Sequence, residues 1–362
     1  MILNSFKIWH ERNSIESKIN NFEFTKQHTN ICKGIAILFM ILHHSVGMYY
    51  NNFDLSWYAQ NSKSVGYLIL LFFSTAGKVC VSLLTILSGY GLAKSFSKIE
   101  SNTGFIQDIK FIISRYVKLY SIYLPIVFAI TITRILCSVL WKNSLDMAVQ
   151  LKYILFDLSM ICRISINDWY LTAIIILYFL FPMLYRLIRE NSTTIIILTA
   201  VPWVIRALFN VTNFKFDSFW SCLLPFSLGI CFEQKNVLHR FKLNNPELCV
   251  ILPSICVVSA FVLRLIFSLP MDVFFALSII FFEINVLSMQ KYIDSVLNCL
   301  GKNSANMWLL HGSLLPLIVC GNPVFKFILV TLISLLISFV IEKTKAVTGY
   351  NKIFLRLRNY LK

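Results

Sequence analysis

Charged side chains are scarce in this chain of 362 residues, of which only 14% are Asp, Glu, Lys or Arg, while 57% are hydrophobic. Soluble domains are about one quarter charged, so this composition excludes a water-soluble enzyme. The sequence also lacks internal repeats, low-complexity tracts and Gly/Ser-rich linkers. Those absences exclude a repeat protein and favour one helical membrane domain.

Spacings that would hold a metal ion or a disulfide framework are missing as well. The chain contains ten cysteines but no CxxC pair and no Cys/His pattern typical of zinc sites. Cysteines such as Cys32, Cys80 and Cys222 lie within apolar runs, where cysteine acts as a small hydrophobic residue. We therefore expect no metal site and no disulfide framework.

Long apolar runs are what the sequence does contain, and they predict about ten membrane spans of about 20 residues each. A shorter apolar piece at 151–162 carries Asp157, which favours an interfacial or re-entrant helix. The sequence thus predicts an all-α, polytopic transmembrane helical bundle. The ten expected spans are residues 34–50, 66–93, 119–140, 169–188, 193–212, 218–233, 248–268, 271–290, 304–321 and 324–342.

The net charge of +16 comes from 33 Lys and Arg against 17 Asp and Glu. In a soluble protein such an excess would suggest nucleic acid as a partner. Here the basic residues instead gather in the segments expected on one side of the membrane. If the N-terminus is cytoplasmic, 23 of the 33 basic residues face the cytoplasm, so we expect both termini there and membrane lipids, not nucleic acid, as partners. The charged start, through Lys26, argues against a cleaved signal peptide. We expect a polar segment at 1–29, a transmembrane domain at 30–342 and a basic tail at 343–362.

Two adjacent histidines, His43 and His44, stand inside the first expected span. An ionisable side chain is costly inside a bilayer unless it is paired or faces water, so each one is a candidate for function. His44 is about 16 Å along the helix from Lys33, and neighbouring residues point about 100° apart, so at most one histidine faces a given cavity. The alternative is that both imidazoles cap the outer end of the helix.

Basic residues at the inner surface are the second set of candidates. Arg115 and Lys118 are three residues apart and share a helical face. The pair suits a phosphorylated ligand, although ordinary anchors that touch lipid phosphates would look the same. Lys78 would lie deep in the membrane unless its helix starts later. It would then either snorkel to the surface or pair with an acid, and Glu283 is the acid well inside a span.

Other polar or small residues inside the spans allow two interpretations each. Ser88, Gly89 and Tyr90 let a ligand or simply another helix come close. Trp169 at a span end is typical of an aromatic belt. His311, followed by a glycine, suits a polar contact or a helix break.

Five segments together resemble the acyltransferase 3 family of integral membrane O-acyltransferases. The run from Lys33 to His44 resembles the first-span signature of this family, and aligned from the basic residue the family histidine falls on His44, not His43. The resemblance covers residues 30 to 320. Four further segments follow in family order: Leu87-Ser88-Gly89-Tyr90, Arg115-Tyr116-Val117-Lys118, Trp169-Tyr170-Leu171 with Tyr178 and Pro182, and Gly301-Lys302-Asn303-Ser304 to His311.

The sequence departs from the family pattern at several positions. Lys33 and Lys118 replace arginines, which keeps the charge but loses the bidentate fork. Many members carry a glutamate after the W-[FY]-L segment, whereas Thr172, Ala173 and Ile174 follow here. A role for that acid is therefore not carried over.

The resemblance implies transfer of an acetyl or other short acyl group from cytoplasmic acyl-CoA to a hydroxyl of a surface glycan or its lipid-linked precursor, in a bacterial inner membrane. Acyl-CoA, most simply acetyl-CoA, would be a co-substrate, and no permanently bound cofactor is implied. His44 would act as general base or transient acyl carrier, with Arg115 and Lys118 binding the donor. The residues expected to shape the cavity are His43, Ser88, Gly89, Tyr90, Trp169 and His311.

Two other functions fit the composition. A flippase or transporter of a lipid-linked sugar would have similar hydropathy, but such proteins often show two similar halves or matching broken helices, and the sequence shows neither. A glycan polymerase would be expected to have a large outer loop, and the expected outer loops are short.

Overall fold

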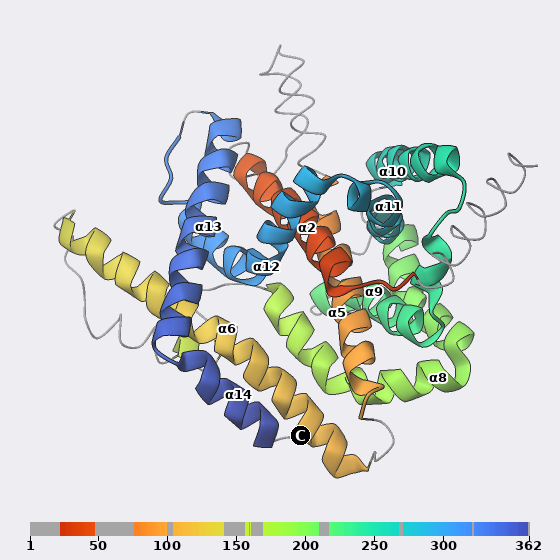
Figure 1. Ribbon diagram of the computed structural model, residues 1–362, viewed down its shortest axis with the longest axis horizontal. Helices are drawn as coiled ribbons and strands as arrows, with labels where there is room; N and C mark the ends of the chain where they lie inside the picture. Colours follow the sequence, from red (N-terminus) through yellow and green to blue (C-terminus); the bar gives the residue numbers. More distant parts are fainter. Residues whose placement is uncertain are drawn as a thin grey trace, which may run out of the picture.

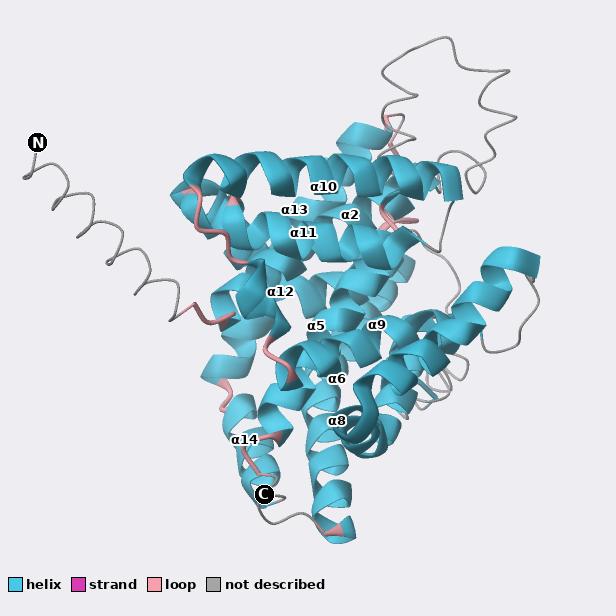
Figure 2. Cartoon of the chain, turned by 90° about the vertical axis from the view of Figure 1, so that its right-hand side faces the viewer, coloured by secondary structure: helices cyan, strands magenta, loops and turns pink. Residues whose placement is uncertain are grey.

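The computed structural model describes residues 22–47, 76–99, 104–140, 156–158, 160, 169–209, 217–267, 271–320 and 322–360. Across these ranges the regular elements are all helices (Figures 1 and 2), which confirms the helical class. Most of the piece at 151–162 lies outside the described residues. The α-helices are α2 (Lys26–Gly47), α5 (Val79–Phe96), α6 (Phe105–Leu140), α8 (Trp169–Phe209), α9 (Asp217–Gln234), α10 (Pro246–Phe267), α11 (Asp272–Asn285), α12 (Lys291–Leu314), α13 (Pro323–Val347) and α14 (Tyr350–Tyr360), with short 3-10 turns at Val237–Phe241 and Leu287–Met289.

Six of the described helices are long and apolar enough to cross a membrane: α2, α5, α6, α8, α10 and α13. The expected span at 271–290 is instead α11, whose 14 residues rise only about 21 Å, less than the ~30 Å of hydrocarbon in a bilayer. Of the expected span at 304–321, residues 304–314 belong to α12, which runs from Lys291 to Leu314. The total of about ten spans and the cytoplasmic location of both termini stay predictions.

Helix α8 consists of two helical segments that meet at a kink at Asn191. They correspond to two of the expected spans, 169–188 and 193–212. Asn191 has non-helical backbone angles, φ −144° and ψ 78°. Its side-chain oxygen accepts a hydrogen bond from the Thr194 amide at 3.2 Å, which is how an N-cap residue starts a new helical segment. The break therefore falls at the polar junction between the two apolar runs.

Helix α2 lies at the centre of the bundle, packed against α12, α5, α13 and α11 (Figure 1). Glycines bring α2 and α12 together: a Cβ added at Gly301 would overlap the Asn30 carbonyl oxygen, and one at Gly34 would overlap the Leu297 carbonyl oxygen. Backbones approach this closely only where no side chain intervenes. The two helices that carry the candidate histidines are thus held in direct contact.

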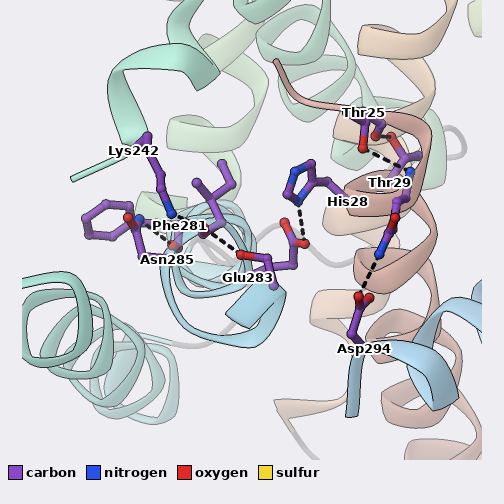
Figure 3. A network of polar contacts seen from close by, with 11 residues as sticks. Thr25, His28, Thr29, Lys242, Phe281, Glu283, Asn285 and Asp294 are labelled. Atoms are coloured by element: carbon purple, nitrogen blue, oxygen red, sulfur yellow. Dashed lines mark hydrogen bonds and ion pairs between the residues drawn. The ribbon is translucent and has the colours of Figure 1, made fainter. Parts of the chain in front are cut away.

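A polar network fixes the start of α2 to α11 and α12 (Figure 3). His28 Nδ1 lies 2.8 Å from Glu283 Oε1, and Glu283 is fully buried. Gln27 Nε2 donates to Asp294 Oδ2 at 2.6 Å. Glu283 therefore pairs with His28 and not with Lys78, which was one of the two alternatives for that lysine. Lys78 is exposed and immediately precedes α5, because that helix starts later than the apolar run suggests.

Replacing His28 with leucine is expected to lower the free energy of unfolding by about 3 kcal/mol, because it leaves the Glu283 carboxyl buried without its partner. Thermal unfolding in detergent measures the change. The double variant H28L/E283M should recover most of the stability, since two apolar groups leave no charge unpaired. Equal loss in the single and double variants would contradict the pairing.

Candidate functional site

Two histidines that are far apart in the sequence meet inside the bundle. The imidazole rings of His44 on α2 and His311 on α12 have their centroids 5.1 Å apart. His43 packs edge-on against His44, also at 5.1 Å. His44 is exposed, whereas His43 and His311 are buried, with 7% and 6% of their surface exposed. Of the three rings, His44 is therefore the one that an incoming molecule can reach.

The backbone sets the tautomer of His311. Its Nδ1 makes a hydrogen bond with the carbonyl oxygen of Trp308, one turn earlier in α12. A carbonyl oxygen only accepts, so Nδ1 carries the hydrogen and, in the neutral ring, Nε2 is left as an acceptor. The site thus combines an accessible imidazole with a buried one of fixed orientation.

A line of aromatic and hydroxyl side chains continues from His311 into the bundle. The Trp308 ring contacts Tyr170 of α8 edge-on, with centroids 5.2 Å apart. Thr85 of α5 donates a hydrogen bond to the Tyr170 hydroxyl at 3.3 Å, and Ser88, one turn further along α5, lies beside the hydroxyl groups of both Tyr170 and Tyr178. We name Trp308, Tyr170, Ser88 and Tyr178 the polar path.

The polar path ends at a group of cations. Tyr178 is within electrostatic reach of Arg115, whose guanidinium carbon lies 4.5 Å from the centre of the Phe111 ring. The Arg115 Nε is buried without a hydrogen-bond partner among the described residues. We name the cations that interact here the basic cluster: Lys26 and Lys33 on α2, Arg115 and Lys118 on α6, and Arg358 on α14.

Helix α2 connects the two ends of the site. Lys26 and Lys33 occupy its first half and His44 its last turn, so about 16 Å of helix separates Lys33 from His44. Lys78, just before α5, is the charged neighbour of His44. The arrangement places a group of cations at one end and an accessible imidazole at the other.

Three of the residues expected to shape the cavity lie in other surroundings. Gly89 faces the Phe226 carbonyl oxygen, where a Cβ would overlap it, so it serves the packing of α5 on α9. Tyr90 packs edge-on against Phe24, with ring centroids 5.4 Å apart. Trp169 is 48% exposed at the start of α8, which is typical of an aromatic belt.

The sequence analysis gave no site role to Tyr170, Tyr178 and Trp308. A signal was present for each: Tyr170 and Tyr178 belong to the fourth family segment, and Trp308 precedes His311 by three residues, on the same helical face. Arg358 gave a weaker signal, as one of several basic residues in an expected tail.

Comparison with known families gives one finding. A family model described as an acyltransferase domain, the acyltransferase 3 model, matches residues 29–343. No curated protein and no solved structure matches the chain. The matched range includes both histidines of the pair and the whole polar path, and it ends before α14.

Proposed function

The chain belongs to the acyltransferase 3 family, and from this premise we propose that it is a membrane O-acyltransferase. It would move an acetyl or other short acyl group from cytoplasmic acyl-CoA to a hydroxyl of a surface glycan or its lipid-linked precursor. The observation that carries the proposal is the contact of His44 with His311, connected by the polar path to the basic cluster. Family membership favours acyl transfer over the transport of a lipid-linked sugar.

The proposed chemistry starts at the accessible imidazole. A hydroxyl oxygen attacks the carbonyl carbon of the thioester while His44 removes its proton, as a base of near-neutral pKa does well. The carbon–sulfur bond then breaks, and His44 returns the proton to the sulfur, so that coenzyme A leaves as a thiol. His311, buried beside it with a fixed tautomer, would orient the His44 ring as a positioning residue.

The basic cluster suits the phosphates of the donor. Arg115 offers a planar fork for bidentate contact and Lys118 a point charge. With the basic end toward the cytoplasm, as the positive-inside rule favours, the donor would arrive from inside and the acceptor would meet it near His44. A bacterial inner membrane is the proposed location, and family membership is what supports it.

Replacing Arg115 with alanine is expected to raise KM for acetyl-CoA about tenfold to a hundredfold with a small change in kcat, because a charge-assisted hydrogen bond contributes about 1.5–3 kcal/mol. The KM of the Arg115→Lys variant should lie between those of the original protein and Arg115→Ala. Steady-state kinetics on membranes measures the effect, and exposed Arg240 gives the control variant R240A. A fall in kcat at unchanged KM would contradict a donor-binding role.

The proposed function is tested most simply in cells. The O-acetyl content of the surface polysaccharide should fall when the gene is removed and return when it is restored, while the glycan chain length stays nearly unchanged. A changed chain length with unchanged acetylation would instead indicate a polymerase. Loss of the whole glycan from the surface would indicate a transporter.

A further inference from the structure

Helix α14 is a short amphipathic element that lies beyond the matched family domain. It spans Tyr350–Tyr360, follows α13 after a turn at Gly349 with φ 71°, and runs alongside α6 (Figure 1). The left-handed backbone at Gly349 suits glycine and lets the chain turn back along α6. A helix expected only as part of a basic tail is thus docked on the element that carries Arg115.

Two basic side chains near the end of α14 lie in different surroundings. Arg356 is exposed, whereas Arg358 is partly buried. The Nε of Arg358 is buried without a hydrogen-bond partner in the described part of the chain. Arg358 interacts electrostatically with both Arg115 and Lys118, so the guanidinium lies within the basic cluster.

Such a convergence of cations is costly unless an anion joins it. Like charges repel, and a buried donor without an acceptor loses its hydration. No described acid is among the groups that interact with Arg115 or Lys118. Two acids on the helices around the cluster have other partners, since Asp108 of α6 pairs with Arg186 at 2.7 Å and Glu342 of α13 pairs with Lys345 at 2.7 Å. The unpartnered Nε atoms of Arg115 and Arg358 together indicate an acceptor that the described residues do not supply.

We propose that Arg358 binds a phosphate of the same ligand that Arg115 binds, which makes α14 part of the site. The ligand then carries at least two phosphate groups, or one phosphate that both guanidinium groups contact. The proposal rests on the proposed function in taking coenzyme A as that ligand. The headgroup of an anionic lipid has the same chemistry and is the competing source.

The test is coenzyme A binding to the purified full-length protein in nanodiscs of phosphatidylcholine, measured by calorimetry. R358A and R358Q are each expected to weaken binding about tenfold or more, while R356A on the same helix stays within about twofold of the original protein. Each variant should have the thermal unfolding midpoint of the original protein, which checks that the substitution has not disturbed the fold.

The outcomes separate the two proposals. Equal affinity of R358A, R358Q and R356A, with R115A weakened, overturns the role of Arg358 and leaves the proposed function standing. No binding of coenzyme A to the original protein overturns the proposed function. In nanodiscs that contain phosphatidylglycerol, a lipid headgroup at the site would compete with coenzyme A in the original protein and not in R358A. That result, together with unweakened binding by R358A in phosphatidylcholine, assigns Arg358 to lipid and overturns the proposal.

Discussion

Replacing His44 with alanine is expected to abolish acylation of the surface glycan while the protein remains inserted at normal abundance. The reason is that His44 is the accessible imidazole of the pair, and a positioned base contributes about 10²–10⁴-fold to such a reaction. Its exposure also means that the substitution removes little packing. The measurement is the O-acetyl content of the glycan in cells that produce the variant, alongside the amount of protein in the membrane.

A histidine outside the site provides the control for this experiment. His239 lies in the short turn Val237–Phe241, away from the histidine pair, and H239A should acetylate normally. If H44A retains full acetylation at normal abundance, the assignment of His44 is wrong. If H44A and H239A lose acetylation equally, the effect does not belong to the histidine pair.

Replacing Gly301 with alanine is expected to reduce the acyl-transfer rate about a hundredfold. The added Cβ would overlap the Asn30 carbonyl oxygen, so the backbones of α2 and α12 must move apart. Because His44 is on α2 and His311 on α12, the same movement separates the two rings, and a misplacement of about 1 Å can cost about a hundredfold in rate. The measurements are the acyl-transfer rate and the thermal unfolding midpoint.

Another glycine of α12 serves as the matched control. A Cβ added at Gly312 meets open space, so G312A is expected to keep both stability and most activity, with the usual gain in helix propensity. Normal activity in G301A would show that the close approach of α2 and α12 does not hold the site together.

The sequence predicted the family better than the contacts between helices. The spacing from Lys33 to His44, together with the order of five motif segments, indicated the family, and the match over residues 29–343 confirms it. His44 is exposed and His43 is buried, and the assignment of His44 as the catalytic histidine stays a prediction.

The pairing of His44 with His311 was not predictable, because it depends on how closely α2 and α12 approach. That approach depends on Gly34 and Gly301 meeting backbone carbonyl groups of the other helix. In the sequence each glycine belonged to a motif, but nothing indicated which helix it would face. The same ambiguity made Gly89 a candidate for the cavity, although it packs α5 on α9.

Composition limited how accurately the ends of the helices could be predicted. The apolar run at 66–93 placed Lys78 deep in the membrane, whereas Lys78 precedes the start of α5 and neighbours His44. Hydropathy gives the extent of an apolar run and not the residue at which the helix begins. Arg358 was not predicted for a related reason: the sequence of a basic tail does not show which residues face solvent and which face a binding site.

The most direct test of the account is acyl transfer in inverted membrane vesicles, whose cytoplasmic face is exposed to the added donor. Vesicles that contain the protein and its native acceptors are incubated with radiolabelled acetyl-CoA, and the label is followed into base-labile esters of the glycan or lipid-linked fraction. The account predicts labelled ester in vesicles with the original protein and none with H44A. No labelled ester with the original protein, or equal labelling with H44A, would contradict it.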